Sequence, residues 1–180
     1  MRSPSASVLK KFARNHSRNA KRSFSICPLI FSNSPGSTPS GLLAQYAGFR
    51  FMELGGQAIV PVDPAVQHLA AEHLTAGDAC LAVSHTGATR EVLIAVGAAV
   101  QKGAKTILIS SFFRSPVSDM VDITLCTGNY ESSFHRQAMA ARAVQIALID
   151  ALIVSAGMLN ASRFAAAQHR SAAAAATHRV

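Results

Sequence analysis

The chain has 180 residues and a mass of 18.9 kDa, a length that favours one domain with a real hydrophobic core. Hydrophobic residues make up 49% of the sequence and charged residues 14%, which excludes a disordered chain. The net charge of +8 does not indicate a nucleic-acid-binding body. Residues 1–22 hold seven of the 17 Lys and Arg and no acid, which leaves ten basic against nine acidic residues elsewhere.

Residues 1–35 are a basic, irregular leader whose first part is similar in composition to a mitochondrial transit peptide. We prefer to interpret this segment as an unstructured leader or the remnant of a missing upstream segment. Ile26–Phe31 could form a first strand, although Pro28 would fit badly at its centre.

The sequence from Ser40 to Leu74 predicts a helix, a strand and a second helix. The apolar spacing of Ser40–Leu54 is mostly helical, and Gly55-Gly56 is a plausible C-cap. Ala58–Val62 is short and β-branched, so we expect a strand. Pro64–Leu74 suits a helix with Asp63 as its N-cap.

From Ala79 onward the pattern becomes a regular alternation of strands and helices. Ala79–Val83 is apolar without alternation, as in a parallel sheet buried on both faces. The elements expected after it are a helix at Thr89–Gln101, a strand at Lys105–Ile109, a short helix at Ser115–Met120, a strand at Asp122–Cys126 and a long helix at Ser132–Met158. We therefore predict an α/β fold. It would be a three-layer αβα sandwich around a mainly parallel, flavodoxin-like five-stranded sheet, with Ile26–Phe31 as its first strand.

Two apolar features are expected to belong to the core. Ala143–Met158 is interrupted by Gln145 and Asp150 and favours a buried helix over a membrane span. Cys80 and Cys126 lie in strand-like runs and are expected to be small buried hydrophobes. With Cys27 the cysteines are odd in number and form no C-x-x-C pair, so we expect no zinc site, no disulfide and a reducing cytoplasm.

A loop between a buried strand and a helix carries the strongest functional signal. Ser84-His85-Thr86-Gly87-Ala88-Thr89 follows Ala79–Val83 directly, at the strand end where open parallel sheets bind ligands. Three of its side chains offer hydroxyl donors. Gly87 allows close backbone approach, and the next helix directs its first amides at the same place. The loop has no lysine, so it favours a phosphate monoester over a Walker-type site, although Ser and Thr before a helix can also be simple N-caps.

The order of motifs from Asp78 to Ser132 resembles the SIS (sugar isomerase) phosphosugar-binding domain. The shared pattern is a strand, S-x-[ST]-G-x-T, a helix closing on K-G-A, a strand ending in Ser, S-P-[LV], [AV]-D-x-x-L and a Glu near the last loop. The stretch ESSFHRQAMAAR at Glu131–Arg142, followed by Gln145 and Asp150, resembles the closing helix of RpiR-type bacterial regulators. This resemblance implies an SIS domain over 36–160 and leaves 161–180 as an Ala-rich tail. From Ala165 we expect that tail to be a frayed helix or disordered.

The resemblance also implies a set of site residues. Those expected to bind the phosphosugar are Ser40, Ser84, Thr86, Gly87, Thr89 and Glu131. His85 and Arg136 are further candidates, with His135 beside the latter, and a loop, interface or solvated face is the alternative for each. No metal and no cofactor is expected. In the family's isomerases the acidic residue can act as a base, whereas in RpiR-type proteins the domain is a sensor.

The chain departs from the family pattern at its first loop. That loop is usually G-x-G-x-S, but here it is Gly36-Ser37-Thr38-Pro39-Ser40, so the second Gly is lost. Pro39 would stiffen the loop and could distort one wall of the pocket. Residues 1–39 show no three-helix pattern, so we expect no helix-turn-helix domain in them. Truncation, a shifted reading frame and a genuine loss of the DNA-binding part remain alternative explanations.

Three functions follow from these observations. The first is a non-enzymatic phosphosugar-binding effector domain of an RpiR-type transcriptional regulator, cytoplasmic and homodimeric or a higher homo-oligomer. Such a protein would contact DNA only through the missing helix-turn-helix domain and would not contact a membrane. The second is a sugar-phosphate isomerase or etherase-like enzyme with Glu131 as its base. The third is a dimerisation module whose pocket no longer binds a ligand.

Overall fold

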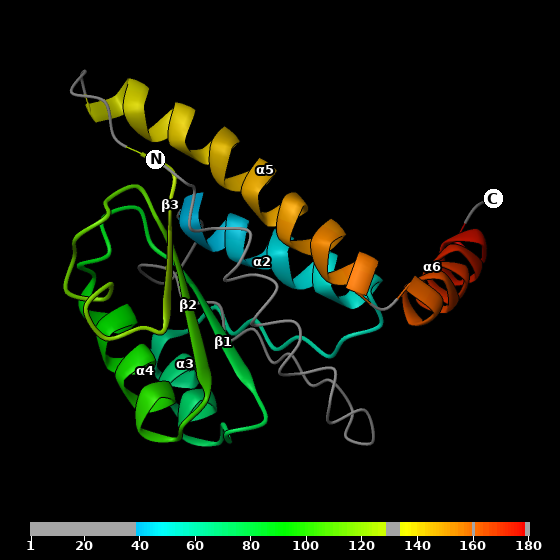
Figure 1. The fold of residues 1–180 in the computed structure, drawn as a ribbon, viewed down its shortest axis with the longest axis horizontal. Coiled ribbons are helices and arrows are strands. Elements are labelled where there is room, and N and C mark those ends of the chain that lie inside the picture. The colour runs from blue at the N-terminus through cyan, green and yellow to red at the C-terminus, as the bar shows by residue number, and fades with distance from the viewer. Residues whose placement is uncertain (1–38, 129–133, 160, 179–180) are drawn as a thin grey trace.

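The computed structural model describes residues 39–128, 134–159 and 161–178, in which helices surround a small sheet (Figure 1). The elements are α2 (Pro39–Glu53), α3 (Pro64–Glu72), β1 (Ala79–Val83), α4 (Arg90–Gln101), β2 (Lys105–Ser110), β3 (Ile123–Cys126), α5 (Phe134–Leu159) and α6 (Ala161–Ala176). The α/β class predicted from the sequence is therefore confirmed.

The three strands of the described residues form one parallel sheet in the order β1-β2-β3. Leu81 pairs with Ile107, and Ile109 pairs in turn with Leu125. All five residues of β1 are buried, because helices cover both faces of the sheet. This burial on both faces explains why the strand is apolar at every position and shows no alternation of apolar and polar residues.

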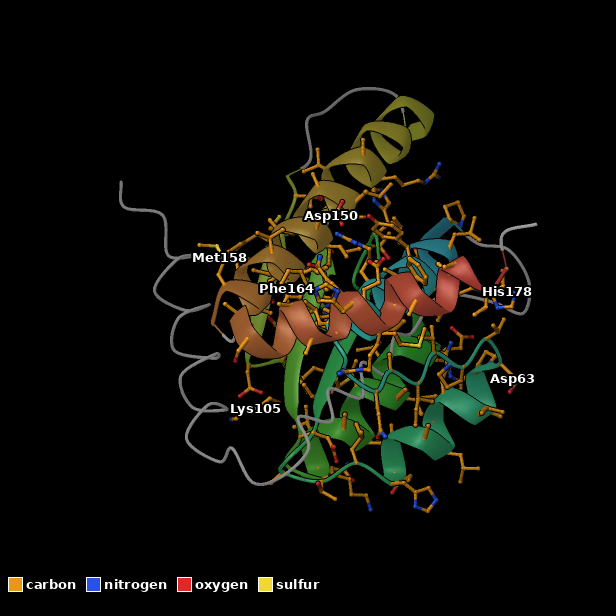
Figure 2. The ribbon with its side chains drawn as sticks, turned by 90° about the vertical axis from the view of Figure 1, so that its right-hand side faces the viewer. Asp63, Lys105, Asp150, Met158, Phe164 and His178 are labelled. Carbon is orange, nitrogen blue, oxygen red and sulfur yellow. The ribbon has the colours of Figure 1, made fainter. Side chains whose placement is uncertain are left out.

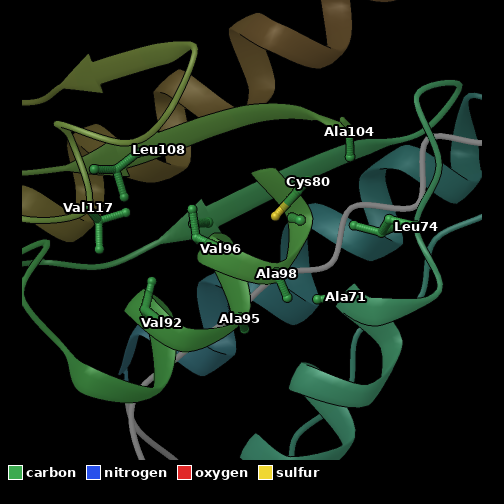
Figure 3. Close-up of a cluster of buried hydrophobic side chains, with 12 residues drawn as sticks. Ala71, Leu74, Cys80, Val92, Ala95, Val96, Ala98, Ala104, Leu108 and Val117 are labelled. Atoms are coloured by element: carbon green, nitrogen blue, oxygen red, sulfur yellow. The ribbon is translucent and has the colours of Figure 1, made fainter. Parts of the chain in front are cut away.

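Successive residues of β1 belong to two separate cores, which gives the fold its three layers. Cys80 and Ala82 face α3 and α4 in one apolar cluster. Figure 3 shows Cys80 in this cluster with Val92 and Val96 of α4. The alternate residues of β1 face α2 and α5 in the second cluster, which includes Phe51 and Ile149.

The five-stranded sheet stays a prediction. Ile26–Phe31 lies outside the described residues, and the strand expected at Ala58–Val62 does not form among them. This segment keeps a strand-like alternation, since Ala58 and Val60 are half-buried in the cluster with α2 while Ile59 is exposed. Pro61 has no N–H to donate, and its carbonyl accepts a hydrogen bond from Gln67 Nε2 (2.9 Å) instead of a strand neighbour.

Two helix ends have the capping residues predicted from the sequence. The Asp63 carboxylate accepts hydrogen bonds from the amides of Ala65 (2.8 Å) and Val66 (3.1 Å) and so caps α3. Gly55 takes a φ of 74° two residues after the end of α2, and its amide donates to Met52 O (2.8 Å).

Besides the strand expected at Ala58–Val62, two local predictions were wrong. Ser115–Met120 is a series of turns and not a continuous helix: Asp119 N donates to Ser115 O (3.2 Å) as in an α-helix, but Met120 N donates to Val117 O (3.1 Å) as in a tighter turn. Cys80 is buried as expected, but Cys126 is exposed at the end of β3, where its Sγ donates to Ser111 O (3.3 Å). The tail, for which a frayed helix or disorder was expected, forms helix α6, in which Ala167 is buried.

The long helix α5 is less buried than its sequence predicts. Its window Ala141–Met158 is long and apolar enough to cross a membrane by length and composition, yet only 28% of it is buried within the described residues. The reading of this segment as a buried helix holds for one face, which contains Ala141, Gln145, Ile149 and Ile153.

Candidate functional site

The Ser84–Thr89 loop joins the end of β1 to the start of α4 and lies at the carboxyl end of the sheet. Gly87 is buried in the middle of this loop with a φ of 63°, a conformation that favours glycine. A Cβ at this position would lie 2.1 Å from Ser115 Oγ. The Gly87 carbonyl accepts a hydrogen bond from the amide of Val117 (3.0 Å), so the turns after β2 fix the loop from the other side.

Two of the three loop hydroxyls shape the loop itself. Ser84, 4% exposed, accepts a hydrogen bond from the amide of Gly87 on its Oγ (3.1 Å). Thr86 is exposed, and its Oγ1 accepts from the amide of Ala88 (3.3 Å). Each hydroxyl accepts in these bonds and keeps its own O–H as a donor.

Thr89 differs from the other two because it does not cap its own helix. It is the N-cap residue of α4, with φ −71° and ψ 130°, but its side chain makes no capping hydrogen bond. The first amides of α4 therefore keep the positive end of the helix dipole directed at the loop. Hydroxyl donors, a close backbone and a helix N-terminus together suit a small anion such as a phosphate group.

The residues at the end of β2 are hydrogen-bonded to the backbone of the loop. The carbonyl of His85 accepts hydrogen bonds from the amide of Ser111 (3.1 Å) and from Ser110 Oγ (3.1 Å). Ser110 and Ser111 are buried, and the amide of Thr127 donates to Ser110 O (2.9 Å). The sequence reasoning did not assign these two serines to the site. Their signal was their place immediately after an apolar strand, the same signal that marked Ser84.

His85 is a half-buried residue attached to this support. Its Nδ1 is hydrogen-bonded to Ser111 Oγ (2.8 Å), and its ring meets Phe112 edge-on with 5.9 Å between ring centroids. Burial lowers the pKa of His85, and the positive charge of Arg142 lowers it further. We therefore expect the ring to be neutral near pH 7. Arg142 was not among the residues predicted for the site.

The remaining predicted residues lie apart from the loop in sequence. Ser40 is in the first turn of α2, which begins at the end of the sheet where β3 finishes (Figure 1). Glu131 lies outside the described residues. His135 and Arg136 belong to the first turn of α5, and their side chains are outside the described part of the chain.

Sequence comparison relates most of the chain to known proteins. The SIS domain profile matches residues 36–155. The HTH-type transcriptional regulator RpiR of Escherichia coli K12 is 30% identical over 125 residues, which are 69% of this chain and 42% of that protein. The chain thus spans about two fifths of the length of the curated relatives it matches.

Solved structures share the fold. The NanR protein of Vibrio vulnificus, determined in complex with ManNAc-6P, has a TM-score of 0.78 at 23% identity and covers 95% of this chain and 62% of its own. The sugar isomerase domain of the RpiR transcription factor from Sphaerobacter thermophilus has a TM-score of 0.71 at 16% identity, with coverages of 93% and 86%. At these identities the likeness establishes the fold and not the ligand.

Proposed function

The chain belongs to the SIS domain family, and we propose that it is a sugar-phosphate sensor, the effector domain of an RpiR-type transcriptional regulator. In this proposal a cytoplasmic sugar phosphate binds at the Ser84–Thr89 loop and controls transcription of carbohydrate-metabolism genes. DNA would be contacted by a helix-turn-helix domain, and the part of the chain described here would respond to the ligand. The regulators among the relatives support this assignment.

The observation that carries the proposal is the uncapped N-terminus of α4 beside Ser84 and Thr86. The side chain of a capping residue usually accepts a hydrogen bond from the first amides of a helix. At the capping position of α4, the Thr89 side chain makes no such hydrogen bond. A phosphate monoester supplies the acceptor oxygens and the negative charge that such a terminus favours.

A thermal-shift screen with the purified chain tests this function. We expect a hexose or amino-sugar phosphate at millimolar concentration to raise the melting temperature of the wild type, because a ligand that binds the native state stabilises it. Ser84→Ala and Thr89→Ala should reduce this shift. Thr177→Ala is the control: it removes a hydroxyl just after the end of α6, where Thr177 Oγ1 donates to Ala174 O, and it should leave the thermal shift unchanged.

Two results would contradict the sensor assignment. A wild type that responds to none of the sugar phosphates would favour a module without a working pocket. Conversion of an aldose phosphate to a ketose phosphate by the pure protein would favour the isomerase alternative, with Glu131 as base.

We further propose that the protein is a homodimer joined through one exposed side of α5. The outer face of α5 is defined by Val144, Ala147, Ala151, Val154 and Met158. These residues are exposed, follow one another at intervals of three and four, and carry no charge, as in the seam of a coiled coil. Met158, at the end of this face, is 78% exposed and projects away from the ribbon (Figure 2).

A second copy fits the outer face of α5 better than a bilayer does. The side of α5 next to this face is bound to α2, where Asp150 accepts hydrogen bonds from Tyr46 (2.7 Å) and Arg50 (2.8 Å). Entry of the helix into a membrane would break this network or carry its charges into the lipid. No charged side chain lies on the outer face to exclude an identical partner.

A further inference from the structure

The phosphate loop itself contains no cation. Its donors are hydroxyls and amides, whereas a phosphate monoester carries a charge of about −1.5 to −2 near pH 7. A site that is partly removed from water binds such an anion more strongly when a fixed positive charge lies beside it. The cation must therefore come from another element of the fold.

The contact between α2 and α5 places Arg142 near the start of α2. Asp150 of α5 bonds to Tyr46 and Arg50, so it lies level with the middle of α2. The two helices run in the same direction from the carboxyl end of the sheet (Figure 1). Arg142 precedes Asp150 by eight residues, ~12 Å along the helix, and the same distance back along α2 leads to its first turn, which contains Ser40.

Arg142 also acts on the Ser84–Thr89 loop from its place on α5. It is half-buried, and its charge is felt by the ring of His85. The ion pairs between residues that the structure describes do not include Arg142. A partly buried guanidinium without a carboxylate is costly, and an anion that binds beside it removes that cost.

Among the residues whose side chains the structure describes, the other basic residues near this end of the sheet are less suited to the role. Arg90 begins α4 and Arg114 follows β2, and both are exposed, where solvent and salt weaken their attraction for an anion. Lys102 and Lys105 are at the opposite end of the strands and are paired with Glu72 and Asp122.

We propose that Arg142 of α5 is a ligand-binding residue that supplies the positive charge for the phosphate group held by the Ser84–Thr89 loop. This deepens the proposed function and rests on it. The guanidinium offers paired N–H donors that match two phosphate oxygens, so lysine is an imperfect replacement. Ser40 on α2 and Arg142 on α5 then approach the ligand from the side opposite α4.

Binding isotherms of four proteins test this assignment: the wild type, Arg142→Gln, Arg142→Lys and Arg170→Gln. The probes are inorganic phosphate and the sugar phosphate that gives the largest thermal shift with the wild type. Arg142→Gln should weaken the binding of both at least ~10-fold and should reduce its dependence on salt, since one charge contact is lost. Arg142→Lys should give an intermediate affinity. Arg170→Gln removes the same charge from α6 and should bind like the wild type.

A second readout separates a ligand contact from a structural role. The ring of His85 can be titrated by NMR, and loss of the Arg142 charge should raise its pKa in Arg142→Gln without ligand. Bound phosphate should raise the pKa of His85 in the wild type and should have little effect in Arg142→Gln at the same concentration. A variant weakened only by misfolding would lose the distinct His85 signal.

The two proposals fail in different ways. If the wild type binds neither probe, the sensor function and the role of Arg142 both fall. If the wild type binds and Arg142→Gln binds equally well, the sensor function stands and the role of Arg142 is refuted. Should Arg142→Gln not fold, Arg142→Lys decides, because wild-type affinity in that variant would exclude a paired contact with the phosphate.

Discussion

At the scale of single residues, Gly87 is the position where backbone and packing restrict the site most. Its φ of 63° lies in the left-handed region, and Ser115 occupies the space that a side chain would need. The glycine was predicted from its place in the loop. The close contact with Ser115 was not predicted, because Ser115 comes from the turns after another strand.

Gly87→Ala should therefore lower both stability and ligand binding. The left-handed conformation and the clash with Ser115 together should cost about 2–4 kcal/mol of unfolding free energy. Gly128→Ala is the matched control, because Gly128 has a φ of 80° but no heavy atom of the described residues lies within 4 Å of the added Cβ. The control should lose only about 1 kcal/mol. Urea unfolding measures both losses, and equal values for the two variants would show that Ser115 simply moves aside.

At the scale of elements, the pairing of α2 with α5 holds the two helices that approach the loop from one side. Asp150 accepts hydrogen bonds from Tyr46 and Arg50, and Arg50 also pairs with Glu53 (Figure 2 shows Asp150 on α5). The hydrogen bond from Tyr46, then that from Arg50, lowers the pKa of Asp150 below its ordinary value. The sequence placed both helices but could not show that these residues meet.

Asp150→Asn should lower the melting temperature at pH 7, since the neutral amide loses the charged pairing with Arg50. The folded pKa of Asp150 is lower than the unfolded value, which is about 3.9. The stabilisation is therefore present above that pH and is lost as pH falls through the folded pKa. The difference between variant and wild type should shrink in acid. Asp119→Asn, at an exposed carboxylate outside this contact, is the control, and a difference that does not change with pH would contradict the role of the Asp150 charge.

At the scale of the whole molecule, the exposed side of α5 is the surface through which we propose that the protein assembles. The helix is apolar around most of its circumference, yet only one face packs against α2 and the sheet. An apolar helix face of this length on a folded protein marks an interaction surface.

Val154→Lys should convert the proposed homodimer to a monomer, because it places a charge in the outer face of α5 and repels its copy in the partner. Val66→Lys on α3 is a matched control, since Val66 is 49% exposed and Val154 52%. Sedimentation equilibrium gives the mass of each protein. A Val154→Lys variant that stays dimeric, or a wild type that is monomeric at micromolar concentration, would refute this interface.

The sequence by itself determined the α/β class, most helix and strand bounds and the Ser84–Thr89 loop, because these depend on local signals: apolar runs, caps and a glycine after a strand. It overestimated the burial of α5 and of Cys126, and it predicted a strand at Ala58–Val62, because apolar composition does not reveal which neighbours cover a residue. The tertiary structure decided that Ser110 and Ser111 support the loop, that Ser115 lies against Gly87 and that the charge of Arg142 reaches His85. Each of these contacts joins segments far apart in the chain, and only the packing of the sheet and its helices brings them together.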